Sequence, residues 1–477
     1  MFDIAIIGGG VIGGMLARQL SRYQLSVCLL EKENDVAVGA TKANSGIVHG
    51  GYDPTPGTLK ARLNAEGVEK LYRVAEELHV PYRKNGSLVC AFGTSAQEDT
   101  VRALYERGLA NGVKGLEILT GDEARELEPA LSEQVSMVLH VTNAGIICPY
   151  ELTVAAIGNA MDNGMALKVN FAVSAIRKTD KGFIVSTENG EGVEAAYVVN
   201  CAGAYVDRIA AMVGDDFFTV IPRAGEYMLL DKNEGVRVSH TIFQVPGPSG
   251  KGVLVTPTVD GNLLIGPTAV QVEAPDCTET TQTGLDTVAR LAAQSVPSVN
   301  MRHVITSFSG VRASEKGGDF IIEPARSAKG MLHVAGIDSP GLTACVAIAD
   351  YAIEALRAMG LQTVEKADFN PYRESPYIFR DMSDDEKDAY IKVHPAYGKI
   401  VCRCETVSEG EIRDAIRRNP PARDLDGVKR RTRSGMGRCQ GGFCMPYVMR
   451  LIAEETGVPM ERVTKKGEGS YQLLEKL

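Results

Sequence analysis

The sequence lacks the features of an exported or membrane-spanning protein. No stretch approaches the ~18 uninterrupted apolar residues that a membrane-spanning helix needs. Asp3 stands where a signal peptide needs positive charge, and glycines from Gly8 to Gly14 interrupt the first apolar run. We therefore predict a cytoplasmic protein with no intrinsic membrane span, so that any attachment to a membrane would come through a partner.

The sequence also lacks an excess of positive charge and a disulfide framework. Its formal net charge is -9 and its basic residues are scattered except near the C-terminus, which excludes nucleic acid as an expected partner. Ten cysteines in 477 residues are too few for a secreted disulfide scaffold. Six of them stand singly among apolar neighbours and are predicted to be buried, namely Cys28, Cys90, Cys148, Cys201, Cys277 and Cys345.

A chain of this length exceeds one compact core, so two or three domains are expected. Its start predicts a strand over Phe2–Ile7, a helix over Val11–Leu20 and a second strand over Leu25–Leu30. Between the first two elements lies Gly8-Gly9-Gly10-Val11-Ile12-Gly13, which matches the dinucleotide fingerprint G-x-G-x-x-G in its proper context. Glu31 would then bind the ribose hydroxyls. At this point NAD and FAD both remain open.

Two later segments favour FAD. Val198–Ala204 and Leu332–Gly336 each run from an apolar strand into small residues, and Pro340-Gly341-Leu342-Thr343 follows the second. Together with the fingerprint, these segments resemble the superfamily of flavoproteins that contains D-amino-acid oxidase and glycerol-3-phosphate dehydrogenase. The resemblance implies an α/β fold in which a Rossmann-like FAD-binding domain is interleaved with a mixed-sheet substrate domain.

The resemblance also implies which residues contact the cofactor. The segment from Gly39 to Gly51 resembles the family stretch along the FAD phosphates and the flavin, and the late glycines would meet the flavin ring at a helix N-terminus. The expected FAD contacts are Gly8, Gly10, Val11, Ile12, Gly13, Glu31, Lys32, Thr41, Ser45, Gly46, Val173, Ala202, Gly203, Gly336, Gly341, Leu342 and Thr343.

His49 lies in the same segment, and the resemblance leaves three roles open for it. It would face the flavin, be joined to it covalently, or serve as a structural histidine. Oxidation of a secondary alcohol needs a base for the hydroxyl proton, and His49 and an unassigned residue are the alternatives. His49 and Arg312 are the predicted catalytic residues.

The substrate is expected to be a small anionic hydroxy compound. Arg312 matches the family arginine that grips a carboxylate or phosphate through its guanidinium fork, with a structural ion pair as the alternative. Tyr227 and Thr268 lie in segments that resemble the cavity lining of L-2-hydroxyglutarate dehydrogenases. Pro56–Arg62 also resembles that branch, although a basic helix start is equally typical of a solvated face.

Four cysteines near the C-terminus form a C-x-C and a C-x4-C pair, namely Cys402, Cys404, Cys439 and Cys444. Four thiolates hold either zinc or an iron–sulfur cluster, and a C-x-C pair is uncommon in structural zinc sites. The spacing resembles the bacterioferritin-associated-ferredoxin type of [2Fe-2S] domain, a small helical module. Ser408-Glu409-Gly410-Glu411 predicts a capping box that opens a helix running to Arg418.

A basic run, Lys429 to Arg433, precedes the second cysteine pair. It would raise the potential of an anionic cluster, dock an acceptor subunit or, most commonly, form a solvated face. The predicted domains are FAD-binding (1–80, 145–215 and 330–368), substrate-binding (81–144 and 216–329), a linker (369–398) and the [2Fe-2S] domain (399–465).

These features together predict an FAD-dependent dehydrogenase that oxidises sn-glycerol 3-phosphate to dihydroxyacetone phosphate. Electrons would leave through the [2Fe-2S] cluster to an electron-accepting flavoprotein or iron–sulfur subunit, because a one-electron centre is not needed for transfer to oxygen. The alternatives are an L-2-hydroxyglutarate or related 2-hydroxy-acid dehydrogenase, an amine or imino-acid dehydrogenase, and a non-enzymatic electron-transfer subunit.

Overall fold

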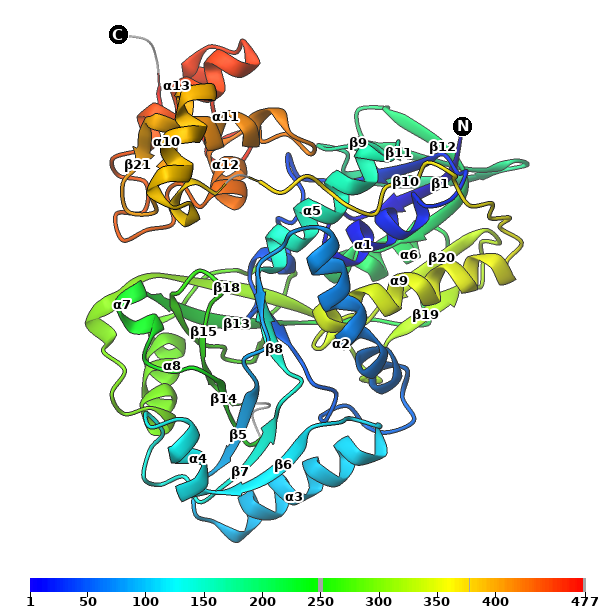
Figure 1. Ribbon diagram of the computed structural model, residues 1–477. Coiled ribbons are helices and arrows are strands. Elements are labelled where there is room, and N and C mark those ends of the chain that lie inside the picture. Colours follow the sequence, from blue (N-terminus) through cyan, green and yellow to red (C-terminus); the bar gives the residue numbers. More distant parts are fainter. Residues whose placement is uncertain (248–251, 377, 475–477) are drawn as a thin grey trace.

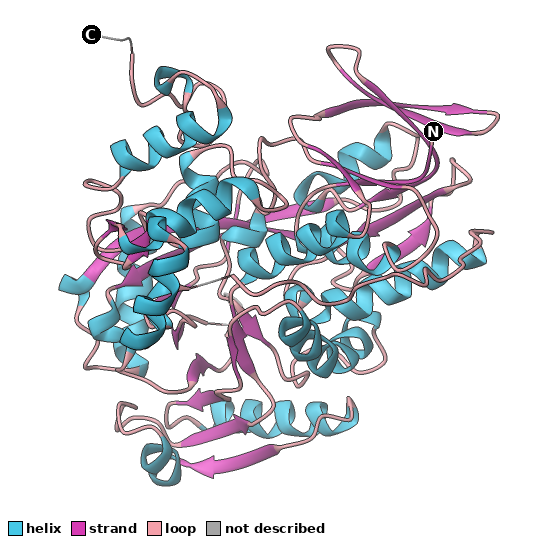
Figure 2. Cartoon of the chain, turned by 45° about the horizontal axis from the view of Figure 1, so that its top comes forward, coloured by secondary structure: helices cyan, strands magenta, loops and turns pink. Residues whose placement is uncertain are grey.

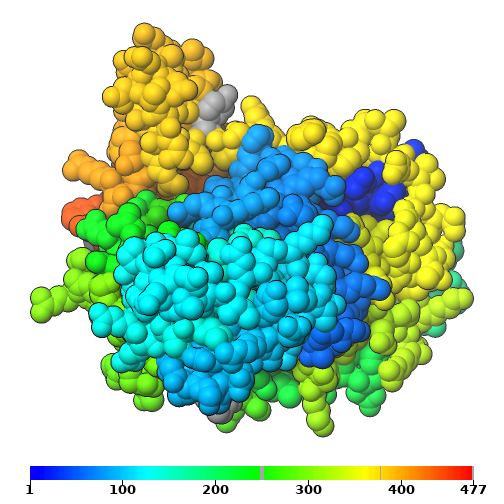
Figure 3. Space-filling model, turned by 60° about the horizontal axis from the view of Figure 1, so that its bottom comes forward, coloured from blue at the N-terminus to red at the C-terminus, as the bar shows by residue number. Residues whose placement is uncertain are grey.

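The computed structural model describes residues 1–247, 252–376 and 378–474. Two large sheets and the helices around them form the body of the molecule, and a C-terminal module rests on one side of it (Figure 1). The space-filling view shows part of this module as a lobe that protrudes from the body (Figure 3).

The first sheet has eight strands and contains the N-terminus. Its order is β10-β11-β12-β1-β2-β9, with β20 on β12 and β19 on β20. The strands are β1 (Phe2–Ile7), β2 (Val27–Leu30), β9 (Ala166–Lys168), β10 (Val173–Thr179), β11 (Gly182–Thr187), β12 (Gly192–Asn200), β19 (Ile321–Pro324) and β20 (Met331–Ala335). Strands β2, β1, β12 and β20 pair in parallel, so their carboxyl ends meet at one edge, where ligands bind in open α/β sheets.

Helices cover this sheet and bury its apolar residues. They are α1 (Val11–Leu20), α2 (Leu59–Glu77), α5 (Pro149–Asp162), α6 (Val206–Ala211) and α9 (Gly341–Ala358). Ile4, Leu16 and Ile348 are among the fully or nearly fully buried side chains of this core. A small third sheet consists of β3 (Ile47–Val48), β8 (Gly145–Ile147) and β4 (Tyr82–Arg83). Its strands belong to the chain segments that connect strands of the first sheet with strands of the second.

The second sheet has nine strands in the order β17-β13-β16-β15-β14-β5-β7-β6, with β18 on β13. The strands are β5 (Ser87–Ala91), β6 (Leu116–Thr120), β7 (Met137–Val141), β13 (Val220–Leu230), β14 (Thr241–Gln244), β15 (Leu254–Pro257), β16 (Leu263–Gly266), β17 (Val270–Gln271) and β18 (Val304–Glu315). The remaining helices of the body are α3 (Ser95–Ala110), α4 (Gly121–Leu127), α7 (Lys232–Gly235) and α8 (Gln282–Ser295). The sheet is mixed, because β14 pairs with β5 in parallel and its other pairs are antiparallel.

The C-terminal module is mostly helical (Figure 2). It contains β21 (Ile400–Cys402), β22 (Val407–Ser408), α11 (Glu409–Arg417), α12 (Leu425–Thr432) and α13 (Met445–Thr456) around its own apolar core. The capping box predicted at Ser408 is confirmed, since Ser408 and Glu411 exchange the two hydrogen bonds of that motif. Within residues 369–398, helix α10 (Asp384–Val393) is followed by Tyr397, whose hydroxyl donates to Asp414 of α11 at 2.6 Å.

The predicted α/β class is confirmed, and the predicted elements of the first sheet are present. The antiparallel pair of β13 and β18, the two longest strands of the second sheet, was not predicted. Five of the six single cysteines are buried as expected, and Cys277 is partly exposed. Among the described residues no helix combines the length and hydrophobicity needed to cross a membrane.

Candidate functional site

The glycine-rich turn between β1 and α1 leaves room for an anion. Gly8 has a φ of +112°, and a side chain there would collide with the Cys201 carbonyl group. A side chain on Gly13 would collide with the Gly8 carbonyl oxygen. A Cβ on Gly10, by contrast, would lie 3.2 Å from the Thr41 hydroxyl oxygen and, beyond its chain neighbours, would have no other described atom within 4 Å. The residue before helix α1 gives it no side-chain cap and its first turn has no acidic residue, so the N–H groups that Thr41 does not bind can receive a phosphate.

Glu31 directly follows β2, beside this turn. One of its carboxylate oxygens accepts the Gly9 N–H at 2.6 Å and the other accepts the Glu33 N–H at 2.9 Å. Burial raises the pKa of Glu31 although these two backbone hydrogen bonds oppose the shift. Lys32 lies over the ring of Tyr205, which follows Ala202 and Gly203 in sequence. Phe171, two residues before Val173, donates its N–H to the Glu31 carbonyl.

The segment from Thr41 to His49 links this turn to helix α9. Thr41 accepts the Val11 N–H at 3.0 Å. At the other end, His49 donates its backbone N–H to Thr343 at 2.8 Å, and its Nε2 lies 3.1 Å from the Ser339 hydroxyl. Helix α9 begins at Gly341 without a side-chain cap. The predicted cofactor segments therefore converge at the carboxyl edge of the first sheet.

One face of the β13–β18 pair approaches the same segment. Tyr227 lies opposite Phe308, and their rings stack with centroids 4.9 Å apart. The Tyr227 hydroxyl is 3.3 Å from that of Ser45, and a side chain on Gly310 would collide with the Ala43 carbonyl group. These contacts bring the second sheet against the predicted flavin segment.

Arg312 follows on β18 after Gly310. Its two terminal nitrogens each lie 3.5 Å from the Thr268 carbonyl oxygen, which is at the long limit of a hydrogen bond. The Thr268 hydroxyl accepts the Glu226 N–H at 3.0 Å. Arg312 has no carboxylate partner among the described residues, so the guanidinium fork retains capacity for an anion.

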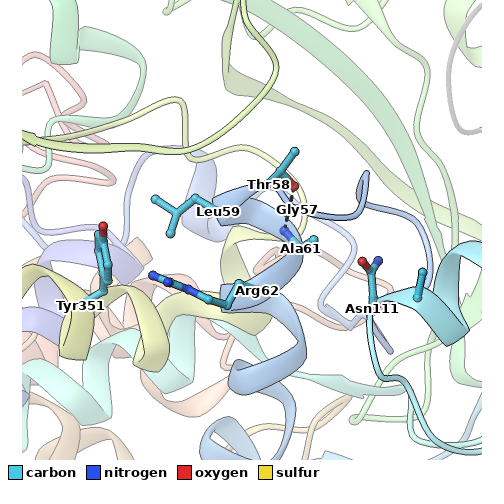
Figure 4. Close-up of a pocket in the computed structure, with 8 residues that line it drawn as sticks. Gly57, Thr58, Leu59, Ala61, Arg62, Asn111 and Tyr351 are labelled. Atoms are coloured by element: carbon cyan, nitrogen blue, oxygen red, sulfur yellow. Dashed lines mark hydrogen bonds between the residues drawn. The ribbon is translucent and has the colours of Figure 1, made fainter.

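The basic helix start at Pro56–Arg62 has two parts with different surroundings. Lys60 is largely buried and pairs with Asp338 at 2.7 Å, and Asp338 accepts from Ser314 of β18 at 3.0 Å. Arg62 is half-exposed and lies over the ring of Tyr351 (Figure 4). The expectation of a solvated face therefore holds for Arg62 and is wrong for Lys60.

Beside Arg62 lies an open cavity of about 470 Å³ (Figure 4). Its lining residues are Gly57, Thr58, Leu59, Ala61, Arg62, Ala110, Asn111 and Tyr351. None of the predicted site residues lies in this cavity.

The four C-terminal cysteines form two pairs. The sulfurs of Cys404 and Cys439 are 3.3 Å apart, and Cys402 is hydrogen-bonded to Cys444. Among the described residues, no three His, Cys, Asp or Glu side chains converge as ligands of a single metal ion. A [2Fe-2S] cluster takes two ligands on each iron. The donor set fits the cluster.

In each pair one cysteine favours the thiolate, namely Cys402 and Cys439. Burial and the hydrogen bond to Cys439 raise the pKa of Cys404, and the hydrogen bond to Cys402 together with burial raises the pKa of Cys444. The hydrogen bond from Cys444, together with the Gly435 and Glu405 N–H groups, lowers the pKa of Cys402 to about 5. Burial opposes deprotonation of Cys439, but a hydrogen bond from Cys404 and the N–H groups of Gly441 and Phe443 lower its pKa on balance. The N–H groups of Gly441 and Phe443 thus approach the Cys439 sulfur, and such N–H groups also stabilise an anionic cluster.

Buried ion pairs hold the module against the body. Arg433 pairs with Asp260 at 2.7 Å and with Glu405 at 2.9 Å, and all three side chains are at most 7% exposed. Arg430 and Arg431 both bind Asp35, which follows Glu31 by four residues. The expectation of a solvated basic face is therefore wrong for these three arginines.

Comparison with known proteins agrees with this geometry. The model of the family described as FAD dependent oxidoreductase matches residues 3–355. The chain belongs to this family. A second model, described as BFD-like [2Fe-2S] binding domain, matches residues 400–454. The chain is therefore an FAD-dependent oxidoreductase, an enzyme, with a [2Fe-2S] domain at its C-terminal side.

Three relatives are informative. The chain is 48% identical over 473 residues to a glycerol 3-phosphate dehydrogenase of Caloramator mitchellensis, covering 99% of this chain and 98% of the relative. The FAD-bound, dithionite-reduced L-alpha-glycerophosphate oxidase of Mycoplasma pneumoniae has a TM-score of 0.75 and 31% identity, over 79% of this chain and 99% of the oxidase. An L-2-hydroxyglutarate dehydrogenase of Escherichia coli is 33% identical over 275 residues, covering 57% of this chain and 64% of the relative.

Sequence reasoning missed the residues that join the two parts of the enzyme. Asp35 and Asp260 gave no signal, because an isolated aspartate in a turn is usually a surface residue. Glu151, at the start of α5, was also missed; burial and the neighbouring Asp260 raise its pKa to about 7.

Proposed function

We propose that this enzyme oxidises sn-glycerol 3-phosphate to dihydroxyacetone phosphate and passes the electrons through its [2Fe-2S] cluster to a protein partner. The observation that carries the proposal is the 48% identity to a glycerol 3-phosphate dehydrogenase over 99% of the chain, cysteine module included. FAD, when bound, supplies the acceptor for the substrate hydride, and the cluster supplies one-electron transfer.

Arg312 is the proposed anchor of the substrate phosphate. Among the described residues its guanidinium makes two long contacts to the Thr268 carbonyl oxygen, and its fork matches phosphate oxygens. Thr268 contacts Arg312 through its carbonyl oxygen, and the Tyr227 hydroxyl lies 3.3 Å from the Ser45 hydroxyl of the flavin segment. An anchored phosphate would orient the secondary hydroxyl toward the flavin segment.

His49 is the proposed base for that hydroxyl proton. Its Nε2 lies 3.1 Å from the Ser339 hydroxyl, and its backbone is fixed by Thr343, so the ring is held at the N-terminus of α9. Ser339 serves as a positioning residue for the imidazole.

The electron relay is supported by the contacts between module and body. Pro149 and the Ile147 carbonyl lie against Gly46 of the flavin segment. The next residue, Tyr150, donates its hydroxyl to the Met436 sulfur at 3.5 Å, and Met436 precedes Cys439 by three residues. The start of α5 thus spans from the flavin segment to the loop of the cysteine pairs. The predicted domain boundaries, including the 369–398 linker, remain part of this proposal.

An anaerobic titration tests the proposal. Glycerol 3-phosphate should bleach the flavin absorption and then produce the electron paramagnetic resonance signal of a reduced [2Fe-2S] cluster. L-2-hydroxyglutarate is the competing substrate, favoured by 33% identity to its dehydrogenases over part of the chain. Bleaching by L-2-hydroxyglutarate alone would replace the proposed substrate, and bleaching by sarcosine or proline alone would indicate an amine dehydrogenase.

A further inference from the structure

The two cysteine pairs differ in their exposure, which gives the cluster an inner and an outer side. Cys402 and Cys444 are 1% and 4% exposed and belong to the apolar core of the module. Cys404 is exposed, and Cys439 is partly exposed. An electron would leave from the outer pair, because that pair lies nearest to the surface.

The surface around the outer pair is cationic and has an apolar centre. We call it the cluster face, and it consists of Arg403, Cys404, Arg438, Gln440, Gly442 and Phe443. Phe443 is 89% exposed, which is unusual for a phenylalanine, and its N–H points at the Cys439 sulfur. Arg403 is exposed next to Cys404 and has no ion-pair partner among the described residues.

The charge of this face is opposite to that of the whole chain. Within residues 401–408 and 435–446 the single carboxylate is Glu405, which is 3% exposed and is bound by Arg433. Arg438 is paired with Asp231 of the body, so Arg403 is the cation of the face that has no carboxylate partner among the described residues. The chain as a whole has a formal net charge of -9. A cationic patch on an acidic protein selects partners by charge, and a large exposed aromatic side chain is a typical contact centre.

We propose that the cluster face docks an acidic electron-transfer protein, with Phe443 at the centre of the contact and Arg403 steering the approach. The inference rests on the proposed function and names its partner. Each docking event moves one electron from the reduced cluster to the oxidised centre of the partner. Two events therefore reoxidise the enzyme for each hydroxyl group oxidised, and the two protons of that oxidation pass to solvent.

Stopped-flow oxidation of the pre-reduced holoenzyme tests this proposal. The acceptors are plastocyanin, an acidic one-electron protein, and cytochrome c, a basic one. Plastocyanin should oxidise the enzyme faster at low salt, and its rate should fall as ionic strength rises. Arg403→Glu should lower the rate of oxidation by plastocyanin about tenfold and raise the rate of oxidation by cytochrome c. Arg403→Lys should retain most of the rate with plastocyanin. Phe443→Ser should lower the rate of oxidation by plastocyanin and leave the dependence of that rate on ionic strength nearly unchanged.

The matched control is Arg177→Glu, which makes the same charge change at an exposed position on β10. It should leave both rates unchanged. Equal rates for the two acceptors, or equal effects of Arg403→Glu and Arg177→Glu, would overturn the proposal. Dithionite can reduce the enzyme if glycerol 3-phosphate does not, so failure of the proposed substrate and failure of the docking face remain distinguishable.

Discussion

Arg433 of the C-terminal module and Asp260 of the second sheet form an ion pair of 2.7 Å across the boundary between module and body. The same guanidinium binds Glu405, which directly follows Cys404, and the Asn262 side chain. A single buried side chain thus connects the loop of the outer cysteine pair to the turn between β15 and β16. We infer that the module is held in a defined position and is not tethered loosely.

Removing Arg433 should therefore destabilise the enzyme strongly. Arg433→Met leaves Asp260 and Glu405 with fewer cationic partners in a buried site, at a cost of about 3–5 kcal/mol. Arg438→Met is the control, because Arg438 is 65% exposed and its pair with Asp231 should contribute at most ~1 kcal/mol. Urea denaturation followed by circular dichroism compares the two variants. Equal losses would contradict a buried anchoring role.

Glu151 should make stability depend on pH. Burial, and then repulsion by Asp260, raise its pKa to about 7 from an ordinary 4.5, although Arg433 and Arg380 oppose the shift. The folded state therefore binds more protons than the unfolded state between these values. The contribution of Glu151 to the free energy of unfolding is therefore fully present below pH ~4.5. It is lost as the pH rises toward 7, by at most ~1.4 kcal/mol per pH unit.

Glu151→Gln should remove this part of the pH dependence. The unfolding free energies of the parent and of Glu151→Gln should diverge between pH 5 and pH 7.5, whereas the exposed control Glu133→Gln should run parallel to the parent. Parallel curves for Glu151→Gln would show that the carboxyl group is not perturbed.

Gly13→Ala should weaken FAD binding. The added Cβ would collide with the Gly8 carbonyl oxygen and distort the turn, at a cost of about 1–3 kcal/mol, or roughly 5- to 150-fold in affinity for FAD. Gly192→Ala is the control, because Gly192 is exposed on β12 and a Cβ there would meet only an Ile184 methyl carbon, at an ordinary contact distance of 3.7 Å. The ratio of flavin to protein absorbance after dialysis measures the difference. A normal flavin content in Gly13→Ala would contradict the assigned turn.

Arg312→Lys should lower kcat/KM for glycerol 3-phosphate by about 10- to 100-fold, since a hydrogen bond to a charged group contributes about 1.5–3 kcal/mol. A lysine keeps the charge but not the fork. Arg302→Lys, at an exposed position shortly before β18, should have no effect. Steady-state assays with an artificial acceptor compare the variants, and an unchanged kcat/KM in Arg312→Lys would remove Arg312 from the substrate site.

Local patterns predicted the local parts of this enzyme well. The strand, turn and helix around Gly8 and the capping box at Ser408 are each specified within a few residues, and the structure has both. The cysteine spacing likewise predicted a module whose family model matches residues 400–454.

Contacts between distant residues were not predictable in this way. Strand β13 contains Pro222 and Gly225, which weaken a strand signal, and its partner β18 lies about 80 residues later in the chain. Arg430 and Asp35 are separated by 395 positions, and Arg433 and Asp260 by 173. A basic run without visible partners is normally solvated, so only the fold reveals that these arginines are anchors.

The most direct test of the account is the electron paramagnetic resonance spectrum of the purified holoenzyme after anaerobic addition of glycerol 3-phosphate. The account predicts bleaching of the flavin absorption together with the signal of one reduced [2Fe-2S] cluster per chain, lost in a Cys404→Ser and Cys439→Ser double variant. Flavin bleaching without a cluster signal, with zinc in place of iron by elemental analysis, would contradict it.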